Sequence, residues 1–144
     1  MEENNVIDAQ VVENDGGEAS AEKHVKINVK LDSGVTVNTE IIVTDVPNLK
    51  RELEMSNALF YSKLRTLFKK AISSDGGVRD LDEFSDELNM CIQFMLNLGI
   101  SVHEYFMNYK SGNWNNETFV MMLVDDCLTV IEAVMNEIRK FESI

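Results

Sequence analysis

Cysteine and proline are scarce in this chain of 144 residues, which contains two cysteines and one proline. Cys91 and Cys127 are far apart, form no CxxC pair, and each lies within an apolar periodic segment. This arrangement gives no support for a zinc site and favours two buried free thiols in a reducing compartment over a disulfide. With so little proline to interrupt them, helices are favoured.

Long apolar runs are also absent. No stretch approaches the roughly 20 apolar residues that span a bilayer, so we expect no membrane partner. The first residues, MEENNVID, lack the basic region and apolar segment of a signal peptide. These two absences predict a cytoplasmic protein. Neither glycine pair, at 16–17 and 76–77, is followed by the Lys-Ser or Lys-Thr of a phosphate-binding loop.

Basic residues are in the minority, with 13 Lys and Arg against 25 Asp and Glu, and the net charge is −12. The charge is unevenly distributed along the chain. Residues 1–22 hold seven acids and no base, residues 23–74 hold nine bases and five acids, and residues 75–144 hold thirteen acids and four bases. A net charge of this sign opposes nonspecific binding to nucleic acid, so we expect no direct nucleic-acid binding.

Residues 1–22 have no aromatic residue and no apolar period. Such a segment buries too little apolar surface to offset its ordering entropy and is predicted to be a disordered acidic tail. The alternative is an acidic arm that docks on a basic site of its own chain or of a partner. Residues 23–144 are predicted to form a single globular domain, since the apolar fraction of 44% suffices for one core at this length.

Residues 24–43 show the period-two alternation of a β-hairpin with one apolar face. The loop Asp32-Ser33-Gly34 suits a type I turn closed by a left-handed glycine. This turn sets a register in which the apolar residues face one another as the pairs Leu31 with Val35, Val29 with Val37, and Val25 with Ile41. Because a hairpin of this kind is only marginally stable alone, it must pack on helices or gain strands from another chain.

Four helices are predicted after the hairpin, at about 46–72, 80–98, 102–110 and 116–141. Their ends are marked by Asp45 before Pro47, by Asp80 with Glu83, by Gly99 and Ser101, and by Asn115 or Asn116. The apolar face of the first helix is expected to consist of Leu49, Leu53, Phe60, Leu64, Leu67 and Ala71. The predicted fold class is therefore α+β, mostly α, with one N-terminal amphipathic hairpin followed by a bundle of about four helices.

The apolar arc of the last helix, 116–141, covers about half of its circumference, which is wider than a surface helix needs. This helix is therefore either central to its own bundle or shared with a second subunit. Together with the two free edges of the hairpin, the arc leads us to expect a homodimer.

Catalytic and metal-binding patterns are weak. His103 and Glu104 are neighbours in a helix and point apart, and nothing signals a third group to orient the imidazole. Aligning Gly76 with the invariant glycine of an EF-hand loop places Ala71 at a ligand position that needs a carboxylate and Asp82 where a bidentate glutamate belongs. We expect neither an enzyme nor a bound metal or cofactor.

Five aromatic residues gather at a helix-loop-helix corner: Tyr105, Phe106, Tyr109, Trp114 and Phe119. Helical spacing places Phe106 and Val102 in the core, Tyr105 half-buried, and Tyr109 and Trp114 at exposed positions. Because tyrosine and tryptophan anchor many protein interfaces, Tyr105, Tyr109 and Trp114 are candidate partner-binding residues.

The densest acidic group of the predicted domain consists of Asp80, Asp82, Glu83, Asp86 and Glu87. These carboxylates favour a helix N-terminus, where the helix dipole stabilises negative charge. They are also candidate partner-binding residues, because a row of carboxylates can imitate the phosphates of a nucleic acid.

Charge, aromatic residues and the lack of a catalytic pattern together favour a small acidic non-catalytic module that binds and regulates, inhibits or chaperones a protein partner. In kind, the chain is similar to small acidic binding proteins of bacteria and their phages. One alternative is an acidic nucleic-acid mimic, like a phage anti-defence inhibitor, that occupies a DNA- or RNA-binding protein. The other is an enzyme with an unrecognised site.

Overall fold

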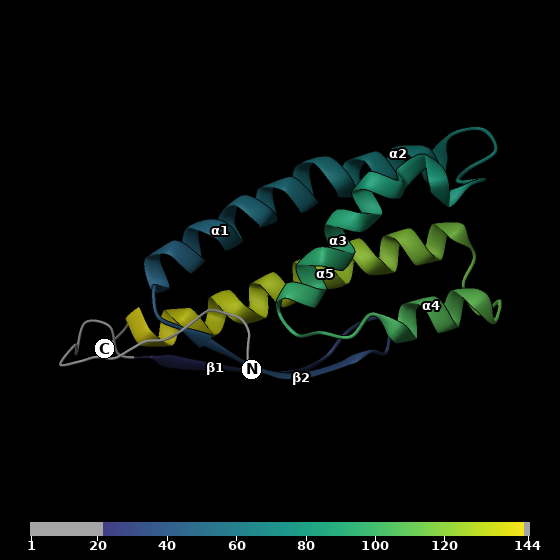
Figure 1. Cartoon of the computed structure of the whole chain (residues 1–144). Helices are drawn as coiled ribbons and strands as arrows, with labels where there is room; N and C mark the ends of the chain where they lie inside the picture. Colours follow the sequence, from purple (N-terminus) through teal and green to yellow (C-terminus); the bar gives the residue numbers. More distant parts are fainter. Residues whose placement is uncertain (1–21, 143–144) are drawn as a thin grey trace.

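A computed structural model describes residues 22–142 and shows an antiparallel hairpin followed by helices (Figure 1). The elements are β1 (Lys23–Lys30), β2 (Thr36–Val43), α1 (Val46–Ala58), the π-helix η3 (Leu59–Arg65), α2 (Thr66–Ser73), the 3₁₀ helix η4 (Leu81–Phe84), α3 (Ser85–Asn97), α4 (His103–Lys110) and α5 (Asn116–Glu142). The predicted class, α+β and mostly α, is confirmed. The predicted tail, 1–22, lies outside the described residues except for Glu22.

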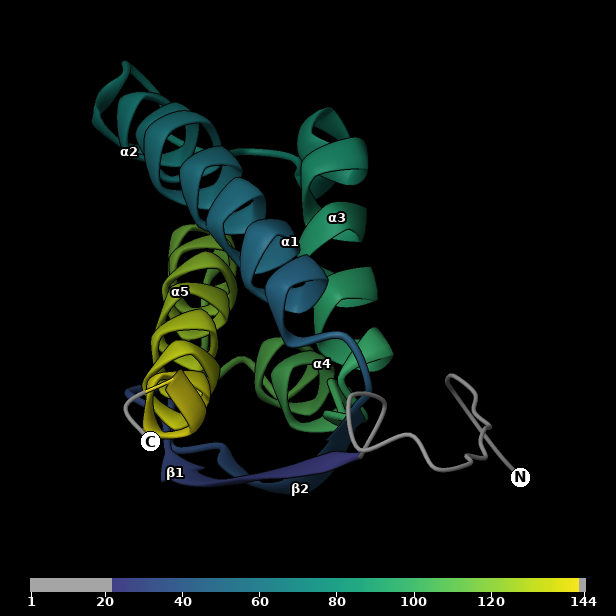
Figure 2. The same cartoon turned by 90° about the vertical axis from the view of Figure 1, so that its left-hand side faces the viewer.

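The hairpin register agrees with the prediction. Val29 pairs with Val37, Val25 pairs with Ile41, and the Leu31 N–H donates to the Val35 carbonyl at 2.8 Å. Gly34 has a φ of 97°, the left-handed conformation that closes a three-residue loop and that other residues rarely adopt. The hairpin lies beside the helices (Figure 2), and apolar residues of both strands, such as Val25, Ile27 and Val37, are buried in the common core.

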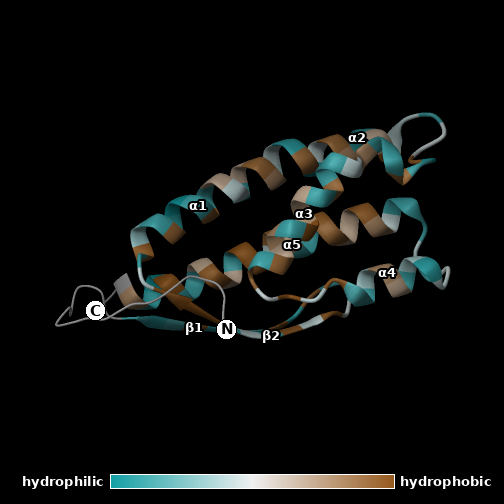
Figure 3. Ribbon diagram, in the orientation of Figure 1, coloured by the Kyte–Doolittle hydropathy of each residue, from teal (hydrophilic) through white to brown (hydrophobic). Residues whose placement is uncertain are grey.

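Helix α5 occupies the centre of the fold and contacts β1, α1, η3, α2, α3 and α4. Its apolar residues recur along much of its length (Figure 3). The fully or almost fully buried ones are Phe119, Val120, Leu123, Val124, Cys127, Val130, Ile131, Val134 and Ile138. The wide apolar arc therefore reflects a helix that is central to its own bundle, because elements of the same chain cover it.

The first predicted helix is continuous but changes its winding in the middle. Seven residues, Leu59–Arg65, form π-helix between α1 and α2. A π-turn adds residues to a turn and rotates the rest of the helix backward relative to a regular α-helix. The core residue of α2 is consequently Phe68, at 0% exposure, whereas Leu67 is 38% exposed. The prediction that Leu67 lies on the buried face was wrong because it assumed a constant α-helical period.

The predicted helix boundaries hold to within a few residues. Asp45 caps α1 by accepting a hydrogen bond from the Asn48 N–H at 3.0 Å. Asp80 caps η4 by accepting one from the Asp82 N–H at 3.0 Å. The second helix differs in that its first turn, Leu81–Phe84, is a 3₁₀ helix. Two ring contacts connect this region to the first helix: Phe68 with Phe84 at 5.4 Å and Phe60 with Phe94 at 5.3 Å between centroids.

Both cysteines are buried and free, as expected, and the Cys127 thiol lies 3.6 Å from the carbonyl oxygen of Cys91. Burial raises the pKa of the Cys127 thiol well above its ordinary value. Within residues 22–142, none of the helices has the length and apolar character needed to cross a membrane.

The change of winding in η3 predicts opposite outcomes for two neighbouring residues. Phe68→Ala should lower the free energy of unfolding by about 3–5 kcal/mol, as for other buried phenylalanines. Leu67→Ala should lower it by about 1 kcal/mol or less, because the leucine is already partly in water. Urea denaturation of the two variants measures both values, and a larger loss for Leu67→Ala would contradict the π-turn.

Candidate functional site

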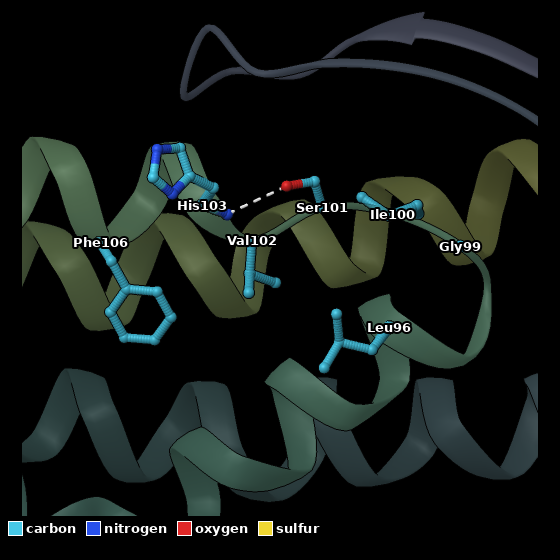
Figure 4. Close-up of a pocket in the computed structure, with 7 residues that line it drawn as sticks. All are labelled: Leu96, Gly99, Ile100, Ser101, Val102, His103 and Phe106. Atoms are coloured by element: carbon cyan, nitrogen blue, oxygen red, sulfur yellow. Dashed lines mark hydrogen bonds between the residues drawn. The ribbon is translucent and has the colours of Figure 1, made fainter.

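An open groove of about 600 Å³ lies where α3 ends and α4 begins. Its apolar walls come from Leu96 on α3, from Val102 in the connection, and from Phe106 on α4 (Figure 4). Val102 lies between the other two side chains, and the imidazole of His103 points away from them. Leu96 is 47% exposed and Phe106 is 38% exposed, so large apolar side chains face solvent here.

The chain reversal at Gly99 creates this groove. Gly99 has a φ of 79°, and the Ile100 N–H donates to the Met95 carbonyl at 2.9 Å while the Gly99 N–H donates to the Leu96 carbonyl at 2.9 Å. This is the Schellman arrangement that ends a helix, and Gly99 was predicted to end one. The next helix begins almost at once, with the Ser101 hydroxyl accepting from the His103 N–H at 3.2 Å. The short connection places the end of α3 and the start of α4 on the same groove.

The aromatic corner is arranged differently from the prediction. Tyr105 is fully buried, so it is not part of the surface on which it was predicted to bind a partner. Phe106, which was predicted to be core, is the exposed residue, although its ring still contacts that of Phe119 at 5.6 Å. The two residues are 100° apart on the helix, so an inward Tyr105 turns Phe106 toward solvent.

The reason for this rotation is a carboxylate inside the core. Asp126 on α5 is fully buried, and its Oδ2 atom accepts hydrogen bonds from the Tyr105 hydroxyl at 2.6 Å and from the Ser33 hydroxyl in the hairpin loop. Its Oδ1 atom has no hydrogen-bond partner among residues 22–142. Because an unpaired buried carboxylate is costly, the two hydroxyl groups hold the loop and α4 against α5.

Burial raises the pKa of the Asp126 carboxyl above its ordinary value. The hydrogen bonds from Ser33 and Tyr105 oppose the rise, whereas the nearby carboxylate of Asp32 adds to it. The pKa of Tyr105 is also raised, first by burial and then by its bond to Asp126, so the phenol keeps its proton. This cluster is a structural anchor, and no sequence motif indicated it.

Tyr109 and Trp114 are half-buried, between the exposed position predicted for them and the core. The Tyr109 hydroxyl donates to Asn116 Oδ1 at 2.6 Å, and its ring lies 5.1 Å from that of Phe119. Trp114 packs against Tyr105 with a centroid distance of 5.9 Å. Both residues therefore support the corner, and both remain partly exposed to solvent.

The acidic group lies at the other end of α3 from the groove. Asp80, Asp82, Glu83 and Asp86 are exposed and Glu87 is half-buried. Asp86 precedes Leu96 by ten residues, which is about 15 Å along a helix. The structure therefore does not unite the two predicted sets of partner-binding residues. Asp80 has the capping role described above, and the other carboxylates lie near a helix N-terminus.

The exposed pair His103 and Glu104 occupies the first turn of α4. Among residues 22–142, no group of three or more His, Cys, Asp or Glu side chains is placed to hold a metal ion. Comparison of the chain with protein-family models, with curated proteins and with solved structures found no match. The candidate site is therefore the groove of Leu96, Val102 and Phe106. None of the three was predicted as a site residue, and Val102 and Phe106 were assigned to the core.

The raised pKa of Asp126 predicts a pH dependence of stability. A carboxyl that holds its proton more tightly when folded contributes its full stability below its ordinary pKa of about 4 and loses that contribution as the pH rises toward the raised pKa. Asp126→Asn keeps the shape of the protonated group and cannot ionise. Its stability relative to the wild type should therefore increase with pH, as measured by urea denaturation at several pH values.

The matched control is Glu132→Gln, which removes an exposed carboxylate from the same helix. Its stability relative to the wild type should vary less with pH than that of Asp126→Asn. Equal pH profiles for the two variants would contradict the assignment of a raised pKa to Asp126.

Proposed function

We propose that this chain is a small non-catalytic protein-interaction module that binds a protein partner and thereby regulates, inhibits or chaperones it. The observation that supports this proposal is the groove between α3 and α4, in which Leu96 and Phe106 remain exposed beside Val102. Clustered apolar side chains at the surface commonly mark an interaction site. The groove is open and mainly apolar, which suits the side chains of a protein segment.

The partner segment is expected to be an amphipathic helix. Residues of two helices line the groove, and an apolar helix face places side chains at intervals of three and four residues that fit between such walls. Phe106 is the expected main anchor, because a large aromatic ring at the centre of an interface contributes most when its surroundings exclude water. Tyr109 and Trp114 lie on the same corner of the fold and belong to the proposed periphery of the site.

The nucleic-acid mimic receives less support. Its proposed acids occupy only the segment from Asp80, the N-cap of η4, to the first turn of α3. The exposed bases Lys63, Lys69 and Lys70 lie on η3 and α2. Bases so near would weaken the field that attracts a nucleic-acid-binding protein. The alternative of an enzyme with an unrecognised site would be favoured by polar residues that converge on a deep pocket, whereas the groove is open and His103 and Glu104 are both exposed.

The test is a paired capture experiment followed by a binding measurement. The wild type and the double variant Leu96→Ala, Phe106→Ala are used to capture proteins from the source cells, and a candidate partner is one that only the wild type retains. With the purified partner, the double variant should raise the Kd at least about 30-fold, the effect of losing an interface hot spot. Isothermal titration calorimetry gives the two values.

The matched control is Met55→Ala, since Met55 on α1 is 67% exposed and does not line the groove. It should bind like the wild type. Thermal unfolding shows whether the double variant is folded, and we expect a moderate loss of stability because both side chains are already partly in water. A folded double variant that binds the partner as tightly as the control would refute the groove as the binding site.

A further inference from the structure

Two exposed strips of opposite charge lie on neighbouring elements of this fold. The basic strip consists of Lys63 on η3 with Leu67 and Lys70 on α2. Leu67 and Lys70 are three positions apart within α2, which is the spacing of residues on one helix face, and Lys63 precedes Leu67 by four positions at the end of the π-helix. Both lysines are exposed, and Leu67 is the 38% exposed residue that the π-turn rotates away from the core.

The acidic strip consists of Asp82 on η4 with Asp86 and Met90 on α3. Asp86 and Met90 are one helical turn apart, and Asp82 precedes them on η4. Both aspartates are exposed, and Met90 is 46% exposed. Each strip therefore has one exposed apolar residue and two charges of a single sign.

The two strips are at the same end of the molecule. Figures 1 and 2 show α2 and the beginning of α3 at that end, and the contact between the rings of Phe68 and Phe84 joins α2 to η4, which directly precedes α3. Within residues 22–142, none of the four charged residues of the strips forms an ion pair. Each strip complements the other in charge, but within one chain they do not pair.

We propose that a second copy of this chain docks here, with the basic strip of one copy against the acidic strip of the other. A two-fold axis makes this contact twice, so that both strips of both copies are used and the assembly closes as a dimer. Leu67 lies between the two lysines of the basic strip and Met90 follows the two aspartates of the acidic strip, so each contact includes one apolar residue, and the charges set the register of the contact. This interface differs from the one expected from sequence, because α5 is covered within its own chain.

The dimer is independent of the proposed partner site. Leu96 is six residues beyond Met90, so the two side chains are about 120° apart around the axis of α3. Groove and strips are consequently on different sides of the helix, and loss of self-association leaves the groove accessible. Failure of one proposal therefore does not decide the other.

The test is a charge-swap experiment read by sedimentation velocity over a range of concentrations. In low salt, we expect the wild type to dimerise as its concentration is raised to about 100 μM. In about 0.5 M NaCl, where charges are screened, the dimer should dissociate. The variant Lys63→Glu, Lys70→Glu and the variant Asp82→Lys, Asp86→Lys should each raise the dimer Kd at least about tenfold. An equimolar mixture of the two should restore the dimer, because each altered strip then meets its complement.

The control Lys30→Glu, Arg51→Glu makes the same change of charge as the lysine variant at exposed positions outside the strips, and it should dimerise more tightly than that variant. A wild type that is monomeric at every concentration overturns the proposal. A dimer that neither swap weakens, or a mixture of swapped variants that stays monomeric, overturns it as well. If the wild type is a monomer and only the variant Lys63→Glu, Lys70→Glu sediments as a more expanded monomer, the acidic segment 1–21 occupies the basic strip in place of a second copy.

Discussion

The buried carboxylate of Asp126 is the interaction on which the arrangement of this fold depends. It lies on the central helix, among side chains that are almost all apolar, and it needs hydrogen-bond donors from other elements. Ser33 and Tyr105 supply them, which fixes the tip of the hairpin and α4 against α5. Because Tyr105 must point inward, Phe106 points outward and becomes a wall of the groove. The hydrogen bonds that Asp126 needs in the core therefore determine that Phe106 is exposed at the groove.

Regular local signals made most of the fold predictable from sequence. The glycine at position 34 fixed the hairpin register, and Asp45, Asp80 and Gly99 marked helix ends that the structure confirms. Each of these residues determines the backbone conformation within a few positions of itself, so the local sequence is enough to predict its effect. The π-turn in η3 was not predictable in this way, because apolar spacing alone is compatible with Leu67 or with Phe68 as the buried residue.

The candidate site was less predictable, because its residues depend on contacts between distant segments. The partner of Tyr105 is 21 positions away and that of Asp126 in the hairpin is 93 positions away. The only available signal was an aspartate in the middle of an apolar stripe, which implies a buried polar partner without identifying it. Val102 and Phe106 were missed for a related reason, since helical spacing alone assigned both of them to the core.

Helix α3 shows how a small chain can support two interactions. One side of this helix packs on the core through Leu88, Cys91 and Met95, and its other two sides carry Met90 and Leu96. The Met90 side also carries Asp86 one turn earlier, whereas the Leu96 side opens into an apolar groove. Contacts of the first kind weaken with salt and contacts of the second kind depend mainly on apolar burial. The two proposed interactions can therefore occur together and respond differently to ionic strength.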